Sequence, residues 1–271
     1  MSDFLAAMSD ASLLRARTAM READATSLDS RVASAPPPRA LVLTAGGFDV
    51  MAEAKLAGPA EGVLTDGGAA RVVQLAQIYA GAGAGAISVL TEESRFAGSL
   101  EHLELVSGQV DAPVLRKDFL VASIQVREAR AAGASGVLLI ARLLPAGLLE
   151  EMTDLTLELG MFALVEVFDR SDLETAAPVF DRDVLVGVNC RDLSTLEVDF
   201  GRFEELAPHL PDDLPAVAES GIESPSDIEI IADLGYRMAL VGSSLVRHRD
   251  PSRLLADMIR AGRARLAGAG N

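Results

Sequence analysis

From about residue 48 onward, short apolar runs alternate with longer stretches in which apolar residues recur at helical spacing. The short runs are almost continuously apolar, which is typical of parallel strands covered on both faces. The longer stretches predict amphipathic helices, several ending at a glycine that suits a left-handed C-cap, as at Gly133, Gly160 and Gly235. The predicted strands are Val50–Ala54, Ala86–Leu90, Pro113–Leu115, Gly136–Ile140, Phe162–Val167, Val184–Val188, Ala216–Ala218 and Met238–Val241. The predicted helices include Ala70–Ala80, Ile124–Ala132, Leu148–Leu159, Ser171–Ala177, Ser226–Leu234 and Pro251–Leu266.

A different pattern precedes this alternation. Residues 1–35 place Leu5, Met8 and other apolar residues near helical spacing, and Pro36-Pro37-Pro38 then stops any helix. We therefore expect one domain over residues 1–271, with an N-terminal helical extension (1–47) and a main body (48–271).

Eight strand–helix units favour an α/β fold of the (β/α)8 TIM-barrel type, with the N-terminal helical extension in front. A doubly wound open sheet is the alternative. That fold would usually show a glycine-rich fingerprint after the first strand, and none is present. The glycines of residues 81–85 precede the second strand, where a helix end and tight turn explain them.

Composition narrows the function classes. The net charge of −16 argues against nucleic acid as a partner, because phosphate backbones need clustered lysine and arginine. With no Trp and two Tyr, base-stacking platforms are not expected either. If the substrate is an anion, a few local cations must reverse the negative field inside the pocket.

Several other classes are not supported. No apolar run approaches the roughly 18 residues of a membrane span, and the start lacks the features of a secretory signal, so we expect no membrane partner and a cytoplasmic location. Cys190 is the only cysteine, which excludes an internal disulfide and a multi-cysteine metal site. His102, His209 and His248 stand apart from other ligands at metal spacing, so we expect neither a metal nor a cofactor. A monomer or weak homo-oligomer is expected.

Candidate chemistry lies where the predicted strands end, because active sites of this barrel form at the carboxyl ends of the strands. Lys117 follows the apolar run Pro113–Leu115 and could be a solvated loop residue, but similar strand ends recur. Three carboxylates and two lysines would meet at one mouth, an arrangement that separates acid from base roles. The strand-end residues are Glu53, Lys55, Thr91, Lys117, Arg142, Glu166, Asn189, Arg191, Glu219, Ser220, Gly242 and Ser243.

The last two strand ends suggest an anion site. Ser220-Gly221 and Gly242-Ser243 place small residues where a loop is expected to enter a helix. Backbone N–H groups at helix starts favour anions, and this barrel often binds phosphate after strands seven and eight. Two ordinary glycine-containing turns are the alternative explanation.

Several of these segments together resemble the indole-3-glycerol-phosphate synthase family. The similarity runs from about Phe48 to Pro251, and the N-terminal extension is also similar. The motifs occur in the family's order and are Ile87–Glu92 with Phe96 and Gly98-Ser99, Pro113–Phe119, Leu164–Val167, Val188–Leu193, Ala218–Ile222 and Val241–Arg247.

The resemblance implies ring closure of 1-(2-carboxyphenylamino)-1-deoxyribulose 5-phosphate, an anionic sugar phosphate, with loss of carbon dioxide and water. Lys117 corresponds to the general acid and Glu166 to the second acid/base carboxylate. Glu53 and Lys55 match the pair that orients the substrate and stabilises charge. The remaining correspondences are substrate contacts at Asn189, Arg191 and Glu219, a phosphate cradle at Ser220, Gly221, Gly242 and Ser243, and an apolar wall at Phe96, Phe119, Leu138 and Leu193, although core packing would also explain the wall.

One family motif is changed. Where the family typically shows Ser-Pro-Ser-Lys-Gly, this chain has Gly58-Pro59-Ala60-Glu61-Gly62, so both hydroxyls are lost and a cation becomes an anion. Glu61 could repel an anionic substrate if it faces inward, or do little at a solvated loop tip. Three hypotheses follow: the family's own activity, a paralogous lyase for a modified arylamino sugar phosphate in specialised metabolism, or a catalytically weak barrel that binds a phosphorylated ligand or a partner enzyme.

Overall fold

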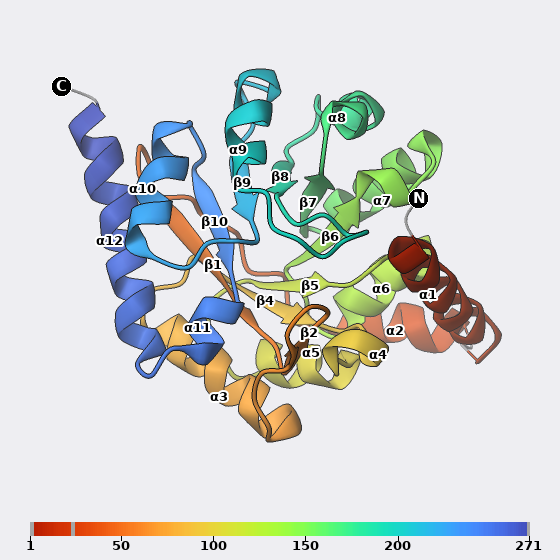
Figure 1. Ribbon diagram of the computed structural model, residues 1–271. Coiled ribbons are helices and arrows are strands. Elements are labelled where there is room, and N and C mark those ends of the chain that lie inside the picture. The colour runs from red at the N-terminus through yellow and green to blue at the C-terminus, as the bar shows by residue number, and fades with distance from the viewer. Residues whose placement is uncertain (1–2, 23–24, 270–271) are drawn as a thin grey trace.

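The computed structural model describes residues 3–22 and 25–269. Eight parallel strands form a closed barrel in the order β1-β10-β9-β8-β7-β6-β5-β4 (Figure 1). The predicted TIM barrel is confirmed, and the open sheet is wrong because β1 pairs with both β10 and β4. The strands are β1 (Asp49–Ala54), β4 (Ala86–Leu90), β5 (Val114–Lys117), β6 (Gly136–Ile140), β7 (Phe162–Val167), β8 (Leu185–Asn189), β9 (Ala216–Glu219) and β10 (Met238–Val241).

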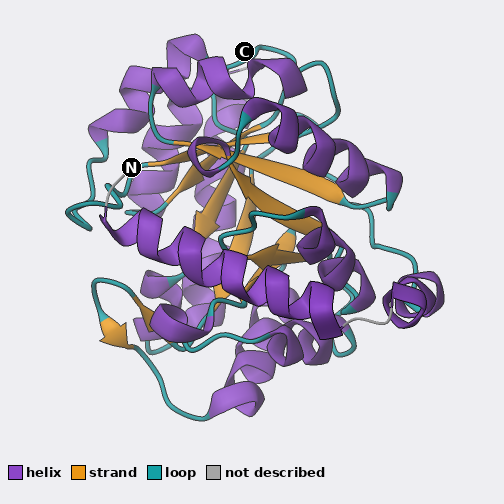
Figure 2. Ribbon diagram, turned by 90° about the vertical axis from the view of Figure 1, so that its right-hand side faces the viewer, coloured by secondary structure: helices purple, strands orange, loops and turns teal. Residues whose placement is uncertain are grey.

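Helices surround the barrel (Figure 2). Those that match the predicted stretches are α3 (Gly68–Gly81), α6 (Ser123–Ala131), α7 (Ala146–Glu158), α8 (Arg170–Ala176), α10 (Pro225–Asp233) and α12 (Pro251–Ala269). The structure adds α4 (Glu93–Phe96), α5 (Leu100–Ser107), α9 (Gly201–Leu206) and α11 (Ser243–Arg247). It also adds an antiparallel hairpin of β2 (Ala57–Gly58) and β3 (Gly62–Val63), which follows β1.

Three helix ends follow the glycine rule that the sequence indicated. Gly133, Gly160 and Gly235 have φ of 83°, 74° and 95°. A side chain at any of them would strain this left-handed backbone, so glycine lets the chain turn from helix to strand within a few residues.

The N-terminal extension forms two helices, α1 (Asp3–Glu22) and α2 (Ala25–Ser34), where the pattern predicted one helical stretch. Residues 1, 2, 23 and 24 of that stretch lie outside the described residues. As expected, α2 ends just before Pro36. Both helices contact α6, and Phe4 of α1 meets Phe119 edge-on at 6.1 Å between ring centroids. Within the part of the chain that is described, no helix is long and apolar enough to cross a membrane.

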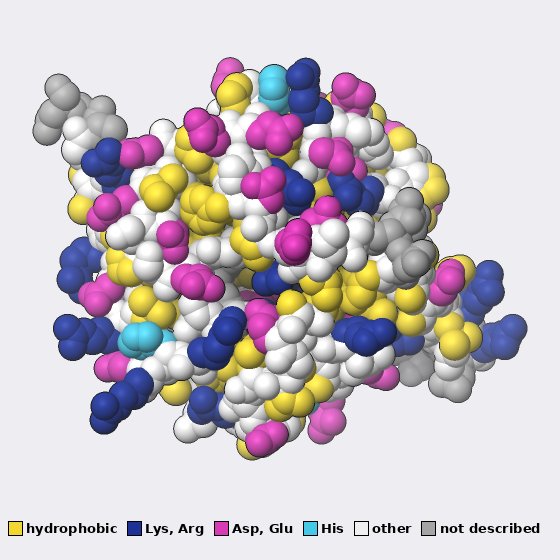
Figure 3. All heavy atoms as spheres, viewed as in Figure 1, with side chains coloured by type: hydrophobic (Ala, Val, Ile, Leu, Met, Phe, Trp, Pro, Cys, Tyr) yellow, Lys and Arg dark blue, Asp and Glu magenta, His cyan; other side chains and the backbone are white. Residues whose placement is uncertain are grey.

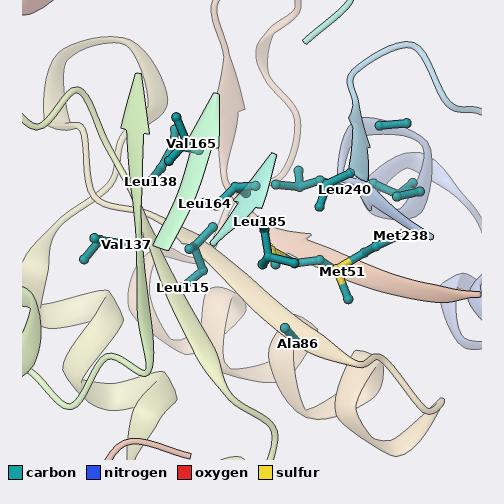
Figure 4. Packing of buried hydrophobic residues seen from close by; sticks show 14 of the residues in the cluster. Met51, Ala86, Leu115, Val137, Leu138, Leu164, Val165, Leu185, Met238 and Leu240 are labelled. Carbon is teal, nitrogen blue, oxygen red and sulfur yellow. The ribbon is translucent and has the colours of Figure 1, made fainter. Parts of the chain in front are cut away.

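The barrel interior explains why the strand ends carry the chemistry. Side chains alternate between the two faces of a strand, so residues two apart share a face. Met51, Leu115, Leu164 and Leu185 are buried in the core and gather between the strands (Figure 4). The residues two positions later are Glu53, Lys117, Glu166 and Gly187, so three of these four inward positions are charged at the carboxyl end of the barrel.

Candidate active site

A cavity of about 200 Å³ opens at the carboxyl ends of the strands. All fifteen residues assigned a role above contribute to its wall: Glu53, Lys55, Phe96, Lys117, Phe119, Leu138, Glu166, Asn189, Arg191, Leu193, Glu219, Ser220, Gly221, Gly242 and Ser243. Residues from every part of the barrel sequence therefore face one volume, as expected for a site built on strand ends.

Lys117 stands between two buried carboxylates. Its Nζ donates to Glu166 Oε2 and to Glu219 Oε2, each at 3.1 Å, and both glutamates are about 1% exposed. Burial alone would lower the pKa of Lys117, but Glu166, Glu219 and Glu53 together raise it above its usual value. Lys117 is therefore an ammonium at neutral pH, with protons to donate.

Burial and mutual repulsion make it unfavourable for both carboxylates beside Lys117 to carry a negative charge. Burial, opposed by Lys117 and assisted by the Glu166 charge, raises the pKa of Glu219 to about 8. Glu219 Oε1 is buried and has no hydrogen-bond partner among the described residues. A proton held by Glu219 beside Glu166 is the physical consequence, and it makes this end of the cavity able to both give and take a proton.

The second lysine forms a separate pair. Lys55, just after β1, places Nζ 2.7 Å from Glu53 Oε1, and both side chains are at most 11% exposed. The chain has only two lysines among its 24 lysine and arginine residues, and both lie on this cavity. Unlike guanidinium, an ammonium can be deprotonated in a protein, so the sequence keeps its two transferable cations for this site. The positions of the two lysines in the sequence carry this signal without the structure.

The backbone around Lys117 is held from outside the barrel. Arg116 donates to Thr91 Oγ1 at 3.1 Å and to the Gln125 carbonyl at 2.8 Å. Asp118 accepts from Arg15 of α1 and from Thr91, both at 2.7 Å. Because the residues on either side of Lys117 are fixed, its side chain has a defined starting point at the cavity floor.

The helix start expected at each of the last two strand ends is present at one of them and absent from the other. Gly242 and Ser243 begin α11, as predicted. Ser220 and Gly221 do not begin a helix, because α10 starts only at Pro225. They instead form a left-handed turn with φ of 70° and 67°. For a serine this conformation is strained, a feature that clusters at functional sites.

The hairpin after β1 brings Glu61 into the cavity. Its side chain is 17% exposed, so it is not a solvated loop tip. Ser243 Oγ donates to Glu61 Oε1 at 3.0 Å, and Arg247 Nη2 and Arg191 Nη2 lie at 3.3 Å and 3.7 Å from the same oxygen. Arg247 and Pro59 also line the cavity, although the sequence pattern assigned them no role.

An apolar wall faces these charges. Phe96 and Phe119 approach at 6.3 Å between ring centroids, and Leu138 and Leu193 line the cavity with them. Two strand-end residues lie elsewhere. Arg142 pairs with Asp172 at 2.6 Å and stacks over Phe168, and Thr91 serves the network around Asp118.

Charged side chains are mixed in sign on the face of the molecule seen in Figure 3. In Figure 3, acidic and basic side chains are interspersed over the visible face instead of gathering in one patch of a single sign. Among the described residues, no group of three or more His, Cys, Asp or Glu side chains could hold a metal ion.

Comparison with known proteins gives a consistent result. The family model described as Indole-3-glycerol phosphate synthase matches residues 11–258. The chain is 43% identical over 253 residues to "Indole-3-glycerol phosphate synthase" from Rhodococcus opacus, covering 92% of this chain and 93% of that protein. It is also 43% identical over 253 residues to "Indole-3-glycerol phosphate synthase 1" from Streptomyces coelicolor, with the same coverage.

Two solved structures support the fold. A tryptophan synthase subunit alpha from Legionella pneumophila has a TM-score of 0.58 at 13% identity, covering 79% of this chain and 92% of that one. A thiamine phosphate pyrophosphorylase from Pyrococcus furiosus has a TM-score of 0.57 at 16% identity, covering 81% and 96%. At these identities the likeness concerns the barrel alone. The family model and the 43% identical relatives show more: this chain belongs to the indole-3-glycerol phosphate synthase family.

Proposed function

We propose that the residues around this cavity close the indole ring of 1-(2-carboxyphenylamino)-1-deoxyribulose 5-phosphate, acting as a carboxy-lyase in tryptophan biosynthesis. The single observation that carries the assignment of roles is the position of Lys117, an ammonium 3.1 Å from both Glu166 and Glu219 at the cavity floor. An acid beside two buried carboxylates, one of them with a raised pKa, suits a reaction that needs proton transfer twice.

In the first step, the ring carbon that bears the carboxylate attacks the ketose carbonyl. Lys117 donates a proton to the carbonyl oxygen, which becomes a hydroxyl, and its positive charge stabilises the negative charge that develops there. Carbon dioxide then leaves, and the electron pair of the broken bond restores the aromatic ring.

In the second step, the new hydroxyl leaves as water and a proton leaves the neighbouring carbon. Glu166 exchanges the protons of this dehydration, and Glu219, whose pKa is raised to about 8 by burial, holds a proton beside it. Glu53 and Lys55 orient the substrate from the β1 side through their 2.7 Å ion pair.

Other residues on the cavity wall suit the remaining parts of the substrate. Asn189 and Arg191 lie on the cavity beside the carboxylates, and Phe96, Phe119, Leu138 and Leu193 offer the anthranilate ring an apolar wall. Ser220, Gly221, Gly242 and Ser243, which line the same cavity, hold the phosphate. Location in the cytoplasm and a monomeric or weakly associating state stay predictions.

The other two hypotheses lose support. A pure binding barrel has no use for a lysine held between two carboxylates, and family membership favours the family's substrate over a modified one.

The test is turnover of the purified full chain with the arylamino ribulose phosphate, followed by indole fluorescence. We expect turnover that Lys117→Ala abolishes. Lys117→Arg is the matched control, because it keeps the charge but cannot release a proton, and we expect it to lose at least about 100-fold in kcat. Binding of the substrate without turnover in the wild type would refute the proposal, as would full activity in Lys117→Arg.

A further inference from the structure

Glu61 makes contacts that a bound anion would make. Its Oε1 accepts a hydrogen bond from Ser243 and lies 3.3 Å and 3.7 Å from the guanidinium groups of Arg247 and Arg191. A hydroxyl and two guanidinium groups around one oxygen are the donor set that proteins use for phosphate. A carboxylate of the protein itself fills this donor set.

The carboxylate is ionised. Burial raises its pKa, but the hydrogen bond from Ser243 and the charges of Lys55 and Arg191 outweigh this effect and hold the pKa of Glu61 below its ordinary value. Glu61 is thus a permanent negative charge against these cations at neutral pH.

Gly58 makes this position possible. A Cβ at residue 58 would collide with Glu61 Oε2, so a serine or alanine there would push the carboxylate away from Ser243. The hairpin pairs Gly58 with Gly62, which has φ of 68°, and the turn between them carries Glu61 back over the cavity. The glycine at residue 58 and the acid at residue 61 therefore act together in placing this carboxylate.

We propose that Glu61 is a specificity-determining residue that occupies the anion subsite of Ser243, Arg191 and Arg247, and that a ligand's phosphate must displace it. The proposal rests on the proposed function in one respect, namely that the displacing anion is the substrate's phosphate. A phosphate dianion carries more charge and more acceptor oxygens than a carboxylate, so it can win this competition, whereas a neutral or weakly charged group cannot. Glu61 therefore selects for phosphorylated ligands at a cost in affinity.

The test is calorimetric titration of inorganic phosphate into the purified full chain at pH 7.5 and fixed ionic strength. Glu61→Gln keeps the size and an acceptor for Ser243 but removes the charge, and we expect phosphate to bind about tenfold more tightly, or about 1.4 kcal/mol. Glu61→Ala, which also frees the space, is expected to give at least as large a gain.

Asp66→Asn is the matched control. Asp66 lies in the same loop, is exposed, and its side chain makes no hydrogen bond or ion pair among the described residues, so this variant changes net charge equally and should bind phosphate within twofold of wild type. In an Arg247→Met background, the gain from Glu61→Gln should shrink, because one of the two cations that Glu61 neutralises is gone.

Turnover separates the two proposals. If the wild type turns over the substrate, Glu61→Gln should lower KM with little change in kcat, because the competition concerns binding alone. If the wild type has no turnover, the proposed function fails, but the phosphate titration still decides the role of Glu61. Phosphate affinity in Glu61→Gln and Glu61→Ala no greater than in Asp66→Asn would overturn it.

Discussion

Replacing Asp118 with alanine removes the anchor beside Lys117. Asp118 is 3% exposed and accepts hydrogen bonds from Arg15, Thr91 and the Phe119 backbone at 2.7 to 2.8 Å. Arg116, itself 2% exposed, lies 3.2 Å away and would lose a carboxylate partner, keeping Glu128 at 3.6 Å. The substitution therefore leaves a buried cation only partly compensated.

The magnitude follows from that burial. Removing one partner of a buried ion pair costs about 3 to 5 kcal/mol, which would lower the Tm of a chain of this length by roughly 10 °C. Loosening the backbone on which Lys117 stands should also reduce kcat, by about 10- to 100-fold, since small misplacements of a catalytic group are costly.

Thermal unfolding and steady-state kinetics measure the two effects. Asp29→Ala is the control, because Asp29 pairs with Arg127 on the surface, where the two side chains are 63% and 42% exposed, and should cost under about 1 kcal/mol. A cycle of Arg15→Ala and Asp118→Ala should show coupling of about 1 to 3 kcal/mol. A Tm of Asp118→Ala equal to that of Asp29→Ala, or zero coupling, would refute the reasoning.

Three further predictions concern the cavity. The pKa of Glu219 in the folded state is raised to about 8, so between about pH 4.5 and 8 the folded chain binds a proton that the unfolded chain has lost. The free energy of unfolding should therefore fall as pH rises through this range. Glu219→Gln should flatten that slope in unfolding experiments at several pH values. Gly58→Ser should expel Glu61 from its contact with Ser243 and tighten phosphate binding in calorimetry, and unchanged affinity would argue against the clash. In Gly242→Ala, the added methyl group should clash with the Glu53 carboxylate, lowering the free energy of unfolding by about 1 to 3 kcal/mol and lowering kcat/KM. Unfolding and kinetic assays measure the two effects, and wild-type values in both would count against this packing.

Strands were predictable because each is a buried apolar run, and the observed bounds differ from the predicted ones by at most two residues, as at Val114–Lys117. The residues that end the strands were readable for the same reason, since inward-facing positions alternate. Short elements were harder. The six residues of α9 and the two-residue strands of the hairpin contain too few apolar positions to show a period.

The direction in which the Glu61 side chain points could not be predicted from the pattern of apolar and polar residues. Whether a loop carboxylate points inward depends on the turn at Pro59–Gly62, on the missing Cβ of Gly58 and on Ser243, which is more than 180 residues away in the chain. The same holds for Ser220, because the sequence shows small residues after β9 but not that α10 begins only at Pro225. Long-range contacts of this kind carry no local signature.

The two lysines offer a spectroscopic window on the site. If the protein is produced with lysine labelled by nitrogen-15 at Nζ, its side-chain ammonium spectrum contains only two resonances, one from Lys55 and one from Lys117. Both belong to the cavity, so no surface signal overlaps them and a single substitution assigns them. Titrating phosphate, substrate or acid would then report directly on the ion pairs of the catalytic centre. In a chain of 271 residues, the resonances of more common residue types would overlap.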